Sequence, residues 1–383
     1  MRVVTAGIGL RAGHMLSLLK KVMPETEIVG YYDPSSSHLE MIGSDVPSFP
    51  DVKSLLSDTT PDLFFVGSPN KFHLEHIKAG LEAGVRILTE KPVVTTIEDT
   101  MELAALLQKH GTDRVMVGLV LRYSQHMIDL RAALDQGALG QIMSLEANEM
   151  IPPYHGSFFM RDWRRSTELS GGFMLEKCCH DLDLYNMVTK SRPKRVASFG
   201  ARRAFVPKFR PTEDENTSFV LQKSTAWNGI DDPYANEGDI IDCQTALMEF
   251  ESGAHMTFHT NLNTPDEQRR FCVVGALGMA EGDFVRGYLN VTKRDGTLVA
   301  RHDYNAGENA KIGAHYGADE MMCEEIARFL RSEIDTLPVG IVDALEAGIA
   351  ALALDQARTT GAMVDLTSVW EKFDQFNLKS QGS

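Results

Sequence analysis

The densest group of ionisable side chains lies between Gly171 and Asp183, where the sequence reads GGFMLEKCCHDLD. If this segment is helical, Glu176 and His180 share one face at a spacing of four residues, and His180 and Asp183 are three apart. Histidine titrates near neutral pH, and a neighbouring carboxylate can orient it and raise its pKa. This face therefore suits proton transfer, and the alternative is a buried helix whose polar groups are simply satisfied.

The cysteines argue against both a metal site and a disulfide framework. Cys178 and Cys179 are adjacent, so they point to different sides of such a helix, and no second Cys or His pair has ligand spacing. The five cysteines are odd in number and irregularly spaced, which fits a reducing compartment. No signal peptide precedes Gly7 and no apolar run approaches a membrane span, so we expect a cytoplasmic protein with no metal and no membrane partner.

A glycine pattern near the first residue suggests a nucleotide cofactor. Gly7-Ile8-Gly9-Leu10-Arg11-Ala12 follows an apolar run and opens an amphipathic segment. In a dinucleotide-binding turn, the first glycine makes the tight bend, the second lets the backbone approach the pyrophosphate, and a small third residue keeps helix and strand close. The alternative is an ordinary strand-to-helix turn.

Asp33 strengthens the cofactor prediction, because it follows Gly7 by 26 residues at the end of the next apolar run. A carboxylate there can accept both ribose hydroxyls of the adenosine. The segment Pro34-Ser35-Ser36-Ser37 offers no Arg or Lys for a 2′-phosphate, so NAD is favoured and NADP is not excluded. Asp33 could instead cap the turn.

Two further groups of polar residues follow apolar runs. Glu90-Lys91-Pro92 comes after the run 85–89, and Ser68-Pro69-Asn70 with His73 comes after the run 63–66. Ligands gather at the carboxyl ends of strands in open α/β sheets, so these residues are candidates for a binding site. A surface turn and a helix-terminal histidine are the alternatives.

The elements that must position these residues alternate over the first 118 residues. Short apolar runs predict strands, and segments with helical periodicity separate them, which indicates a parallel sheet of five or six strands. The expected strands are 3–6, 27–32, 63–66, 85–89 and 115–118, and the expected helices are about 11–23, 71–83 and 97–110.

Beyond Arg122 the pattern changes to mostly alternating strands, which predicts an α+β domain with a mainly antiparallel open sheet. We therefore expect an α/β Rossmann domain over 1–122 and a substrate and oligomerisation domain over 123–383, with C-terminal helices that pack back on the first. The stretch 208–238 is rich in Asp, Asn and Pro and is predicted to be a long insertion or lid. The expected strands are 196–199, 243–250, 255–260, 271–274, 279–282 and 288–292, and the expected helices are about 125–136, 171–188, 319–331 and 342–360.

The composition excludes some classes of partner. The chain has 383 residues, a net charge of −15 and 43% hydrophobic residues, which is typical of a globular protein with two domains. The negative charge disfavours nucleic acid and anionic lipid, while a small anionic cofactor remains allowed because helix N-termini bind phosphate.

Taken together, these motifs resemble the Gfo/Idh/MocA family of oxidoreductases. The resemblance covers both domains and rests on the glycine pattern, Pro69-Asn70 with His73, Glu90-Lys91-Pro92, Arg122-Tyr123 and the Gly-Gly helix that ends in His180-Asp181-Leu182-Asp183. It implies a dehydrogenase or reductase that moves hydride between nicotinamide and a secondary alcohol of a sugar, sugar acid or polyol, and a homodimer or homotetramer formed through the outer face of the second sheet.

The resemblance also implies roles for individual residues. Lys91 would hydrogen-bond the reacting hydroxyl, His180 would act as the general base, and Glu176 stands where the family commonly has Asp, which puts its contact with substrate or with Lys91 in question. The residues expected to bind the cofactor are Gly7, Ile8, Gly9, Leu10, Ala12, Asp33, Ser68, Asn70, His73, Glu90 and Lys91.

Substrate contacts are expected from the aromatic and arginine residues of the second domain, because aromatic faces stack on sugar rings and arginines hold hydroxyls or carboxylates. Three arginines within residues 161–165 also suggest an anionic sugar, although Arg164 and Arg165 could be solvated surface. His315 and Asp319 resemble a loop that returns to the cleft. The residues predicted to bind substrate are Arg122, Tyr123, His155, Arg161, Trp163 and Asp183.

Two other functions use the same residues or the same fold. A glycosidase that oxidises the sugar transiently at C3 and then restores the alcohol would need the same lysine and histidine. A cofactor-binding regulator without catalysis would not need Lys91 together with His180.

Overall fold

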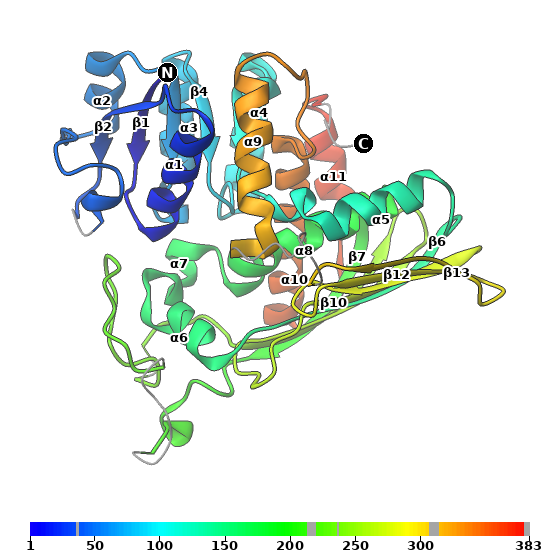
Figure 1. The fold of residues 1–383 in the computed structure, drawn as a ribbon. Coiled ribbons are helices and arrows are strands. Elements are labelled where there is room, and N and C mark those ends of the chain that lie inside the picture. The colour runs from blue at the N-terminus through cyan, green and yellow to red at the C-terminus, as the bar shows by residue number, and fades with distance from the viewer. Residues whose placement is uncertain (36–37, 213–219, 236, 306–313, 379–383) are drawn as a thin grey trace.

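The computed structural model describes residues 1–35, 38–212, 220–235, 237–305 and 314–378 (Figure 1). Its first sheet is parallel, with the strand order β2-β1-β3-β4-β5, as the alternating pattern predicted. All four residues of β3 are buried, because helices cover both faces of a parallel sheet. The strands are β1 (Arg2–Ala6), β2 (Glu27–Tyr32), β3 (Leu63–Val66), β4 (Arg86–Thr89) and β5 (Val115–Val117), and the helices are α1 (Leu10–Val22), α2 (Val52–Thr59), α3 (His73–Glu82) and α4 (Ile97–His110).

The second sheet has nine strands in the order β13-β12-β11-β10-β6-β9-β8-β7-β14 and is mainly antiparallel. The sheet is mixed because β6 pairs with β9 in parallel, and neither β6 nor β13 was predicted from the sequence. The strands are β6 (Ile142–Met150), β7 (Pro193–Ala201), β8 (Cys243–Phe250), β9 (His255–Asn261), β10 (Arg270–Gly275), β11 (Gly278–Asp283), β12 (Tyr288–Lys293), β13 (Leu298–Asp303) and β14 (Val364–Asp365).

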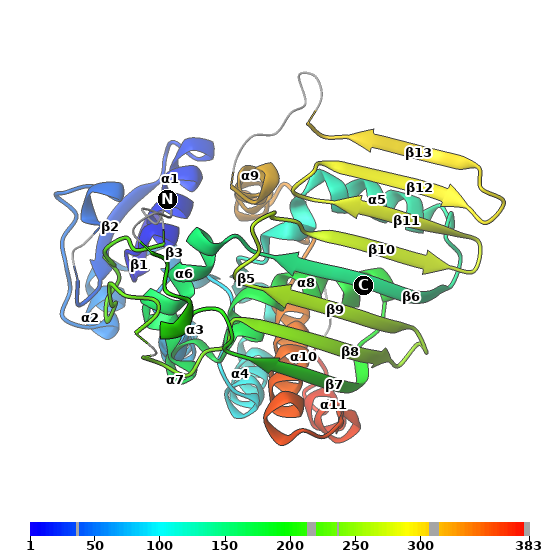
Figure 2. The ribbon, with the colours of Figure 1, turned by 90° about the horizontal axis from the view of Figure 1, so that it is seen from below.

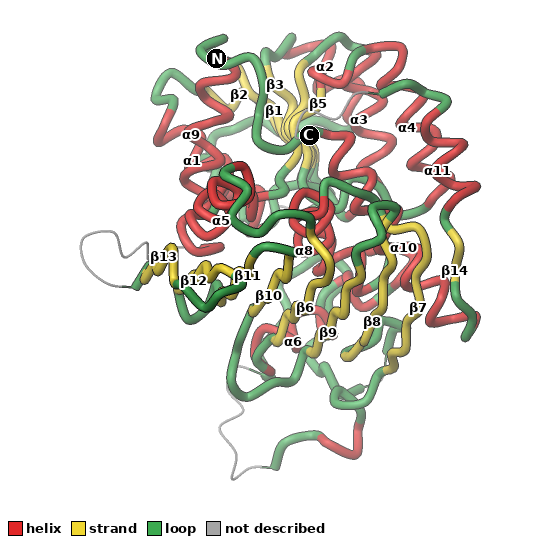
Figure 3. Tube along the Cα trace, turned by 90° about the vertical axis from the view of Figure 1, so that its right-hand side faces the viewer, coloured by secondary structure: helices red, strands yellow, loops and turns green. Residues whose placement is uncertain are grey.

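Helices cover one face of this large sheet, and the other face is open (Figures 2 and 3). Along β8 the side chains alternate between buried and exposed, as expected for a sheet with one solvated face. The open face carries apolar side chains, including Phe199, Leu247 and Val274. The helices of this half are α5 (Gln125–Asp135), α6 (Pro153–Arg161), α7 (Thr167–Ser170), α8 (Phe173–Thr189), α9 (Ala318–Leu330), α10 (Ile341–Thr360) and α11 (Thr367–Asp374).

The C-terminal helices return to the first sheet. Helix α9 packs against α1, and both α10 and α11 contact α4 (Figure 1). We propose a domain boundary at residue 122, because the strands of the first sheet precede it in sequence and those of the second sheet follow it. No helix among the described residues is both long and apolar enough to cross a membrane.

Candidate active site

A cavity of about 1130 Å³ lies between the carboxyl ends of the first sheet and the elements α6 to α8 of the second half. Its walls contain most of the residues predicted to bind a cofactor or a substrate. Those that line it are Gly7, Ile8, Gly9, Leu10, Ala12, Asp33, Ser68, Asn70, Glu90, Lys91, His155, Arg161, Trp163, Glu176 and His180.

The glycine turn between β1 and α1 leaves room for a phosphate. Gly7 has φ +90°, and a Cβ there would lie 2.5 Å from the backbone of Gly67. A Cβ on Gly67 would in turn lie 2.9 Å from Cβ of Ala12, so only small residues allow this close approach of helix and strand. Around Gly9 there is nothing within 4 Å of a Cβ, and α1 begins there without a side-chain cap. Backbone N–H groups at such a helix start bind anions, so the cradle fits a pyrophosphate.

Asp33 lies at the end of β2 and accepts two backbone hydrogen bonds, from Ile8 N at 2.8 Å and from Ser35 N at 2.7 Å. Burial raises its pKa, and these two hydrogen bonds oppose the shift. The carboxylate thus joins β2 to the glycine turn, and its oxygens can each accept more than one bond. The turn role and the ribose role are therefore compatible. Ser36 and Ser37, part of the segment that favoured NAD, lie outside the described residues.

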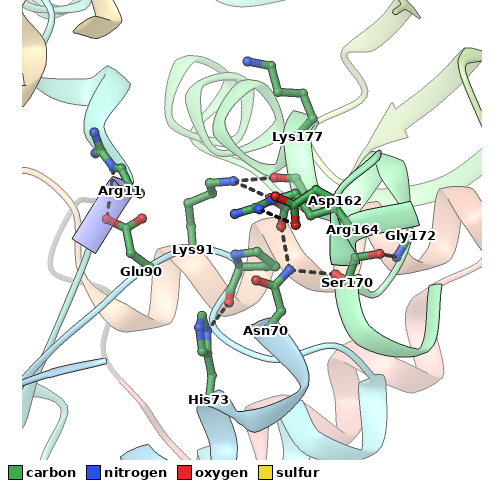
Figure 4. Close-up of polar contacts among 12 residues, drawn as sticks. Arg11, Asn70, His73, Glu90, Lys91, Asp162, Arg164, Ser170, Gly172 and Lys177 are labelled. Atoms are coloured by element: carbon green, nitrogen blue, oxygen red, sulfur yellow. Dashed lines mark hydrogen bonds and ion pairs between the residues drawn. The ribbon is translucent and has the colours of Figure 1, made fainter. Parts of the chain in front are cut away.

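Lys91 and Glu176 both line the cavity and contact each other, and Figure 4 shows Lys91 among its polar neighbours. Lys91 Nζ donates to the backbone carbonyl of Glu176 at 2.5 Å and lies 3.4 Å from its Oε1. Asn70 Nδ2 donates to Glu176 Oε2 at 2.5 Å and to the carbonyl of Ser170 at 2.9 Å. Glu176 thus reaches Lys91 in spite of its extra methylene, and Asn70 links the loop after β3 to α8.

Arg164 completes this cluster, and the sequence reasoning missed its role by allowing it to be solvated surface. Its Nε donates to Glu176 Oε1 at 2.5 Å, its Nη1 lies 3.2 Å from Asp162, and its guanidinium stacks 4.2 Å from the Trp163 ring centroid. Burial would raise the pKa of Glu176, but Lys91, Arg164 and Asn70 outweigh it and hold that pKa below its ordinary value. Glu176 is therefore ionised at neutral pH.

His180 lies on α8, one turn after Glu176, and is buried. Burial lowers its pKa well below 6.5, and the nearby cation of Lys91 lowers it further. The expectation that a carboxylate neighbour raises this pKa is wrong, because Asp183 pairs elsewhere and the buried Nδ1 of His180 has no hydrogen-bond partner among the described residues. A neutral imidazole is the form that can accept a proton.

His73 does not line the cavity, contrary to its predicted cofactor contact. It is fully buried, and its two ring nitrogens each lie 2.8 Å from a backbone carbonyl oxygen, those of Pro92 and Ser68. The Lys91–Pro92 bond is cis. His73 therefore joins the loops that follow β3 and β4 and positions Lys91 indirectly.

Arg122, Tyr123 and Asp183, which were predicted to contact the substrate, are not among the described residues that line the cavity. Arg122 makes a bidentate pair with Asp183 at 2.6 and 2.8 Å, and both are buried. Tyr123 is buried beside this pair. Asp181 is held in the same way by Arg269, at 2.7 and 2.9 Å. The two aspartates that follow His180 in sequence thus anchor α8, and among the described residues no hydrogen bond or ion pair joins either of them to its imidazole.

Arg161 and Arg165 hold the predicted insertion. Arg161 donates to the carbonyl of Gln222 and Arg165 to that of Asn228. The segment 222–227 lines the cavity, and the ring of Trp227 meets that of Phe72 at 6.3 Å. Residues 213–219 and 236 of this stretch lie outside the described residues. The three arginines are thus engaged within the protein, which weakens the case for an anionic sugar.

The two ends of the insertion are joined by one carboxylate. Buried Asp242, just before β8, accepts hydrogen bonds at 2.7 to 2.8 Å from the backbone N–H groups of Arg203, Ala204 and Phe205. The chain between them therefore leaves and re-enters the domain at one point.

His155 and Trp163 line the wall opposite the glycine turn. The His155 ring stacks on Phe159 at 5.8 Å, and burial lowers the pKa of His155 to about 3. Among the described residues, no group of three or more His, Cys, Asp or Glu is placed to hold a metal ion. His155, Phe159 and Trp163 thus give this part of the wall an aromatic surface.

Comparison with known families covers both halves of the chain. Residues 1–119 match the family described as oxidoreductases with an NAD-binding Rossmann fold, and residues 127–281 match its C-terminal domain. The chain is 24% identical over 328 residues to YteT of Bacillus subtilis (strain 168), whose name places it among the oxidoreductases without a substrate; the match covers 73% of this chain and 76% of YteT.

Two further proteins are similar. The chain is 25% identical over 224 residues to the D-xylose dehydrogenase of Paenarthrobacter nicotinovorans, covering 53% of this chain and 56% of that enzyme. Its fold superposes with a TM-score of 0.72 on scyllo-inositol dehydrogenase from Lactobacillus casei with bound NAD(H) and scyllo-inositol, at 18% identity and with 96% and 99% of the two chains covered. The matches to both domains, on a structure with the expected cradle, show that the chain belongs to the Gfo/Idh/MocA family of NAD-binding oxidoreductases.

Proposed function

We propose that this protein oxidises a secondary alcohol of an uncharged sugar or polyol with NAD, and reduces the ketone in the reverse direction. The observation that carries the proposal is the contact of Lys91 with Glu176, one helical turn from His180, in a cavity that continues to the glycine cradle. A cation and a neutral base side by side suit alcohol oxidation, because the hydroxyl must lose its proton as the carbon loses hydride.

Different groups accept the hydride, accept the proton and stabilise the charge on the oxygen. NAD, when bound in the cradle, supplies the acceptor for the hydride that leaves the carbinol carbon. His180 is neutral and accepts the hydroxyl proton, and Lys91 stabilises the negative charge that develops on the oxygen. Glu176 and Arg164 hold the Lys91 ammonium in place. The products are the ketone, NADH and one proton.

The charges of the wall favour an uncharged substrate. Arg164 is paired with Glu176 and Asp162, and Lys177 lies 3.1 Å from Glu149. A substrate carboxylate that binds Arg164 or Lys177 would have to displace one of these buried carboxylates, and breaking a buried ion pair is strongly unfavourable. Hydroxyl groups can join these pairs as donors or acceptors without breaking them.

The test is a panel of aldoses, inositols, alditols and uronates with NAD and NADP, in which NADH formation is followed by absorbance. We expect turnover of an uncharged member, and in Lys91→Ala and His180→Ala a loss of at least about 10²-fold with NAD affinity retained. Lys71→Ala is a matched control, because Lys71 is exposed and pairs with Glu168 outside the cavity.

Other outcomes would identify other functions. Release of an aglycone from a glycoside without net NADH would point to the glycosidase cycle, in which the alcohol is restored. Tight NAD binding without turnover of any member of the panel would refute catalysis and favour a regulator.

We also propose that the open face of the large sheet is the contact between subunits of a homo-oligomer. Phe199 is 76% exposed and Leu247 is 53% exposed, and they lie on neighbouring strands β7 and β8 of that face. Large apolar side chains gathered on an otherwise solvated face are typical of interaction surfaces. Light scattering of the purified protein measures the mass directly.

A further inference from the structure

A second histidine reaches the cavity from the C-terminal part of the chain. His315 lies just before α9 and lines the cavity with Tyr316. The backbone has positive φ at three successive residues, +50° at His315, +61° at Tyr316 and +78° at Gly317. L-residues rarely adopt this conformation, and where they do the surrounding structure fixes it, often at functional sites.

A buried carboxylate orients the His315 ring. Nδ1 of His315 lies 3.1 and 3.2 Å from the two oxygens of Asp319, which is fully buried. Arg11 of α1 binds the same carboxylate in a bidentate pair, 2.8 Å on each side. Burial opposes ionisation of Asp319, but the hydrogen bonds from His315 and Arg11 outweigh it and lower its pKa below the ordinary value. An ionised acceptor at Nδ1 keeps the proton there and leaves Nε2 of His315 as the acceptor.

His180 and His315 lie next to each other. Their ring centroids are 5.8 Å apart with an angle of 50° between the planes. His180 is 3% exposed, whereas the side chain of His315 is 27% exposed. A proton that His180 takes from the substrate is therefore shielded from solvent. His315 is a partly exposed neighbour through which this proton can reach solvent.

We propose that His315, oriented by Asp319, relays the proton from His180 to solvent after each oxidation and back in reduction. The proposal rests on the proposed alcohol oxidation. The proton that leaves the substrate hydroxyl moves from His180 through a bridging water to Nε2 of His315 and then to bulk water, so no oxidant or further reactant is needed. His315 acts through His180 and is a positioning and relay residue, distinct from the catalytic pair Lys91 and His180.

The charges around His315 fit a transient carrier. Burial, with Arg11 and Lys177, lowers the pKa of His315 below 6.5, while Asp319 opposes this. The imidazole is therefore neutral between protons and releases each one to water. The titratable and charged groups around the His180–His315 pair come from α1, α6, α8, α9, the turn before α9 and the loops at β4 and β10; they are Arg11, Lys91, His155, Lys177, Arg269, Tyr316 and Asp319. His14 and Glu90 in turn contact Asp319 and Arg11.

The experiment compares His315→Ala with wild type in stopped flow and in steady state, in a weak, poorly permeant buffer. We expect His315→Ala to form the first equivalent of NADH within about twofold of the wild-type rate, because His180 is intact, and to turn over at least about tenfold more slowly in steady state. Excess imidazole should restore most of the steady-state rate. His14→Ala is the matched control, since His14 lies 3.4 Å from the same Asp319 carboxylate but does not line the cavity.

The outcomes separate this inference from the proposed function. Wild-type steady-state rates in His315→Ala, or a loss of both the first turnover and the steady state that imidazole leaves unchanged, would overturn the relay. A wild-type protein that oxidises no alcohol would overturn the proposed function, and the relay geometry is then judged by ¹⁵N NMR of the histidines without cofactor. The His315 signals are those that disappear from the spectrum of His315→Ala. At neutral pH we expect them to show the Nδ1–H tautomer, and the Nε2–H tautomer would refute the role of Asp319.

Discussion

Replacing Glu176 by Gln tests whether one carboxylate holds the reactive lysine in place. Glu176 meets three donors, Asn70 and Arg164 at 2.5 Å and Lys91 at 3.4 Å. At 3.4 Å and an effective dielectric constant of 20, the attraction to Lys91 alone is about 5 kcal/mol before desolvation is counted. A glutamine carries no charge, and its amide group must turn an N–H₂ toward one of these donors. Loss of one partner from a buried ion pair costs about 3–5 kcal/mol, which we expect as the loss in unfolding free energy.

Glu176→Asp is the matched variant, because it keeps the charge and is one methylene shorter. It can keep some of the three contacts, so we expect a loss of about 1–2 kcal/mol and a smaller fall in turnover than for Glu176→Gln. Urea unfolding followed by tryptophan fluorescence measures the stability, and NADH formation measures turnover. Trp163 stacks on Arg164 and so reports on the site itself. This account of Lys91 would be refuted by a Glu176→Gln protein whose unfolding free energy is within about 1 kcal/mol of wild type and whose turnover is within about twofold of wild type.

Three further results are expected. Asp33→Ala should weaken NAD binding by about tenfold to 10²-fold and NADP binding less, which calorimetry with both cofactors measures, and an equal loss for both would contradict the ribose contact. Burial lowers the pKa of His76 and of His126 to about 4. Below pH 6.5 these two histidines therefore bind protons in the unfolded chain but not in the folded chain. Stability present above pH 6.5 is therefore lost as the pH falls toward 4, by up to about 1.4 kcal/mol per pH unit for each histidine, and His126→Phe should flatten the dependence of the melting temperature on pH in that range. Leu247→Arg with Phe199→Glu should reduce the mass seen by light scattering to that of one chain, while an unchanged mass would place the subunit contact elsewhere.

The first sheet was predictable because its strands are short apolar runs between amphipathic helices. Strand β6 was not, since it carries Glu146 and Glu149, and a buried charge breaks the alternation that marks a strand. Glu149 is buried because Arg269 and Lys177 bind it, and those partners are remote in sequence. Helix α2 is short, but Asp51, whose side chain accepts from Ser54 N at 2.7 Å, is a capping signal that could have revealed it.

The sequence predicted which residues line the cavity better than it predicted which side chains pair with each other. Turn and strand-end signals are local, so Gly7, Asp33 and Lys91 could be assigned to one edge of the sheet. Whether an arginine contacts a ligand or another side chain depends on the tertiary structure. Arg122 lies 61 residues from Asp183, and nothing in their spacing indicates that they pair.

The insertion between Phe205 and Asp242 has a consequence for protein engineering. Because the carboxylate of Asp242 ties the two ends together, those ends stay in place when the length of the chain between them changes. The entropy of closing such a loop grows only slowly with its length, so exchanged segments of different length should be tolerated. Segment 222–227 borders the cavity while the reacting groups Lys91 and His180 lie on other elements. Under the proposed function, we therefore expect a library confined to this segment to change which alcohol is accepted without disturbing Lys91 and His180.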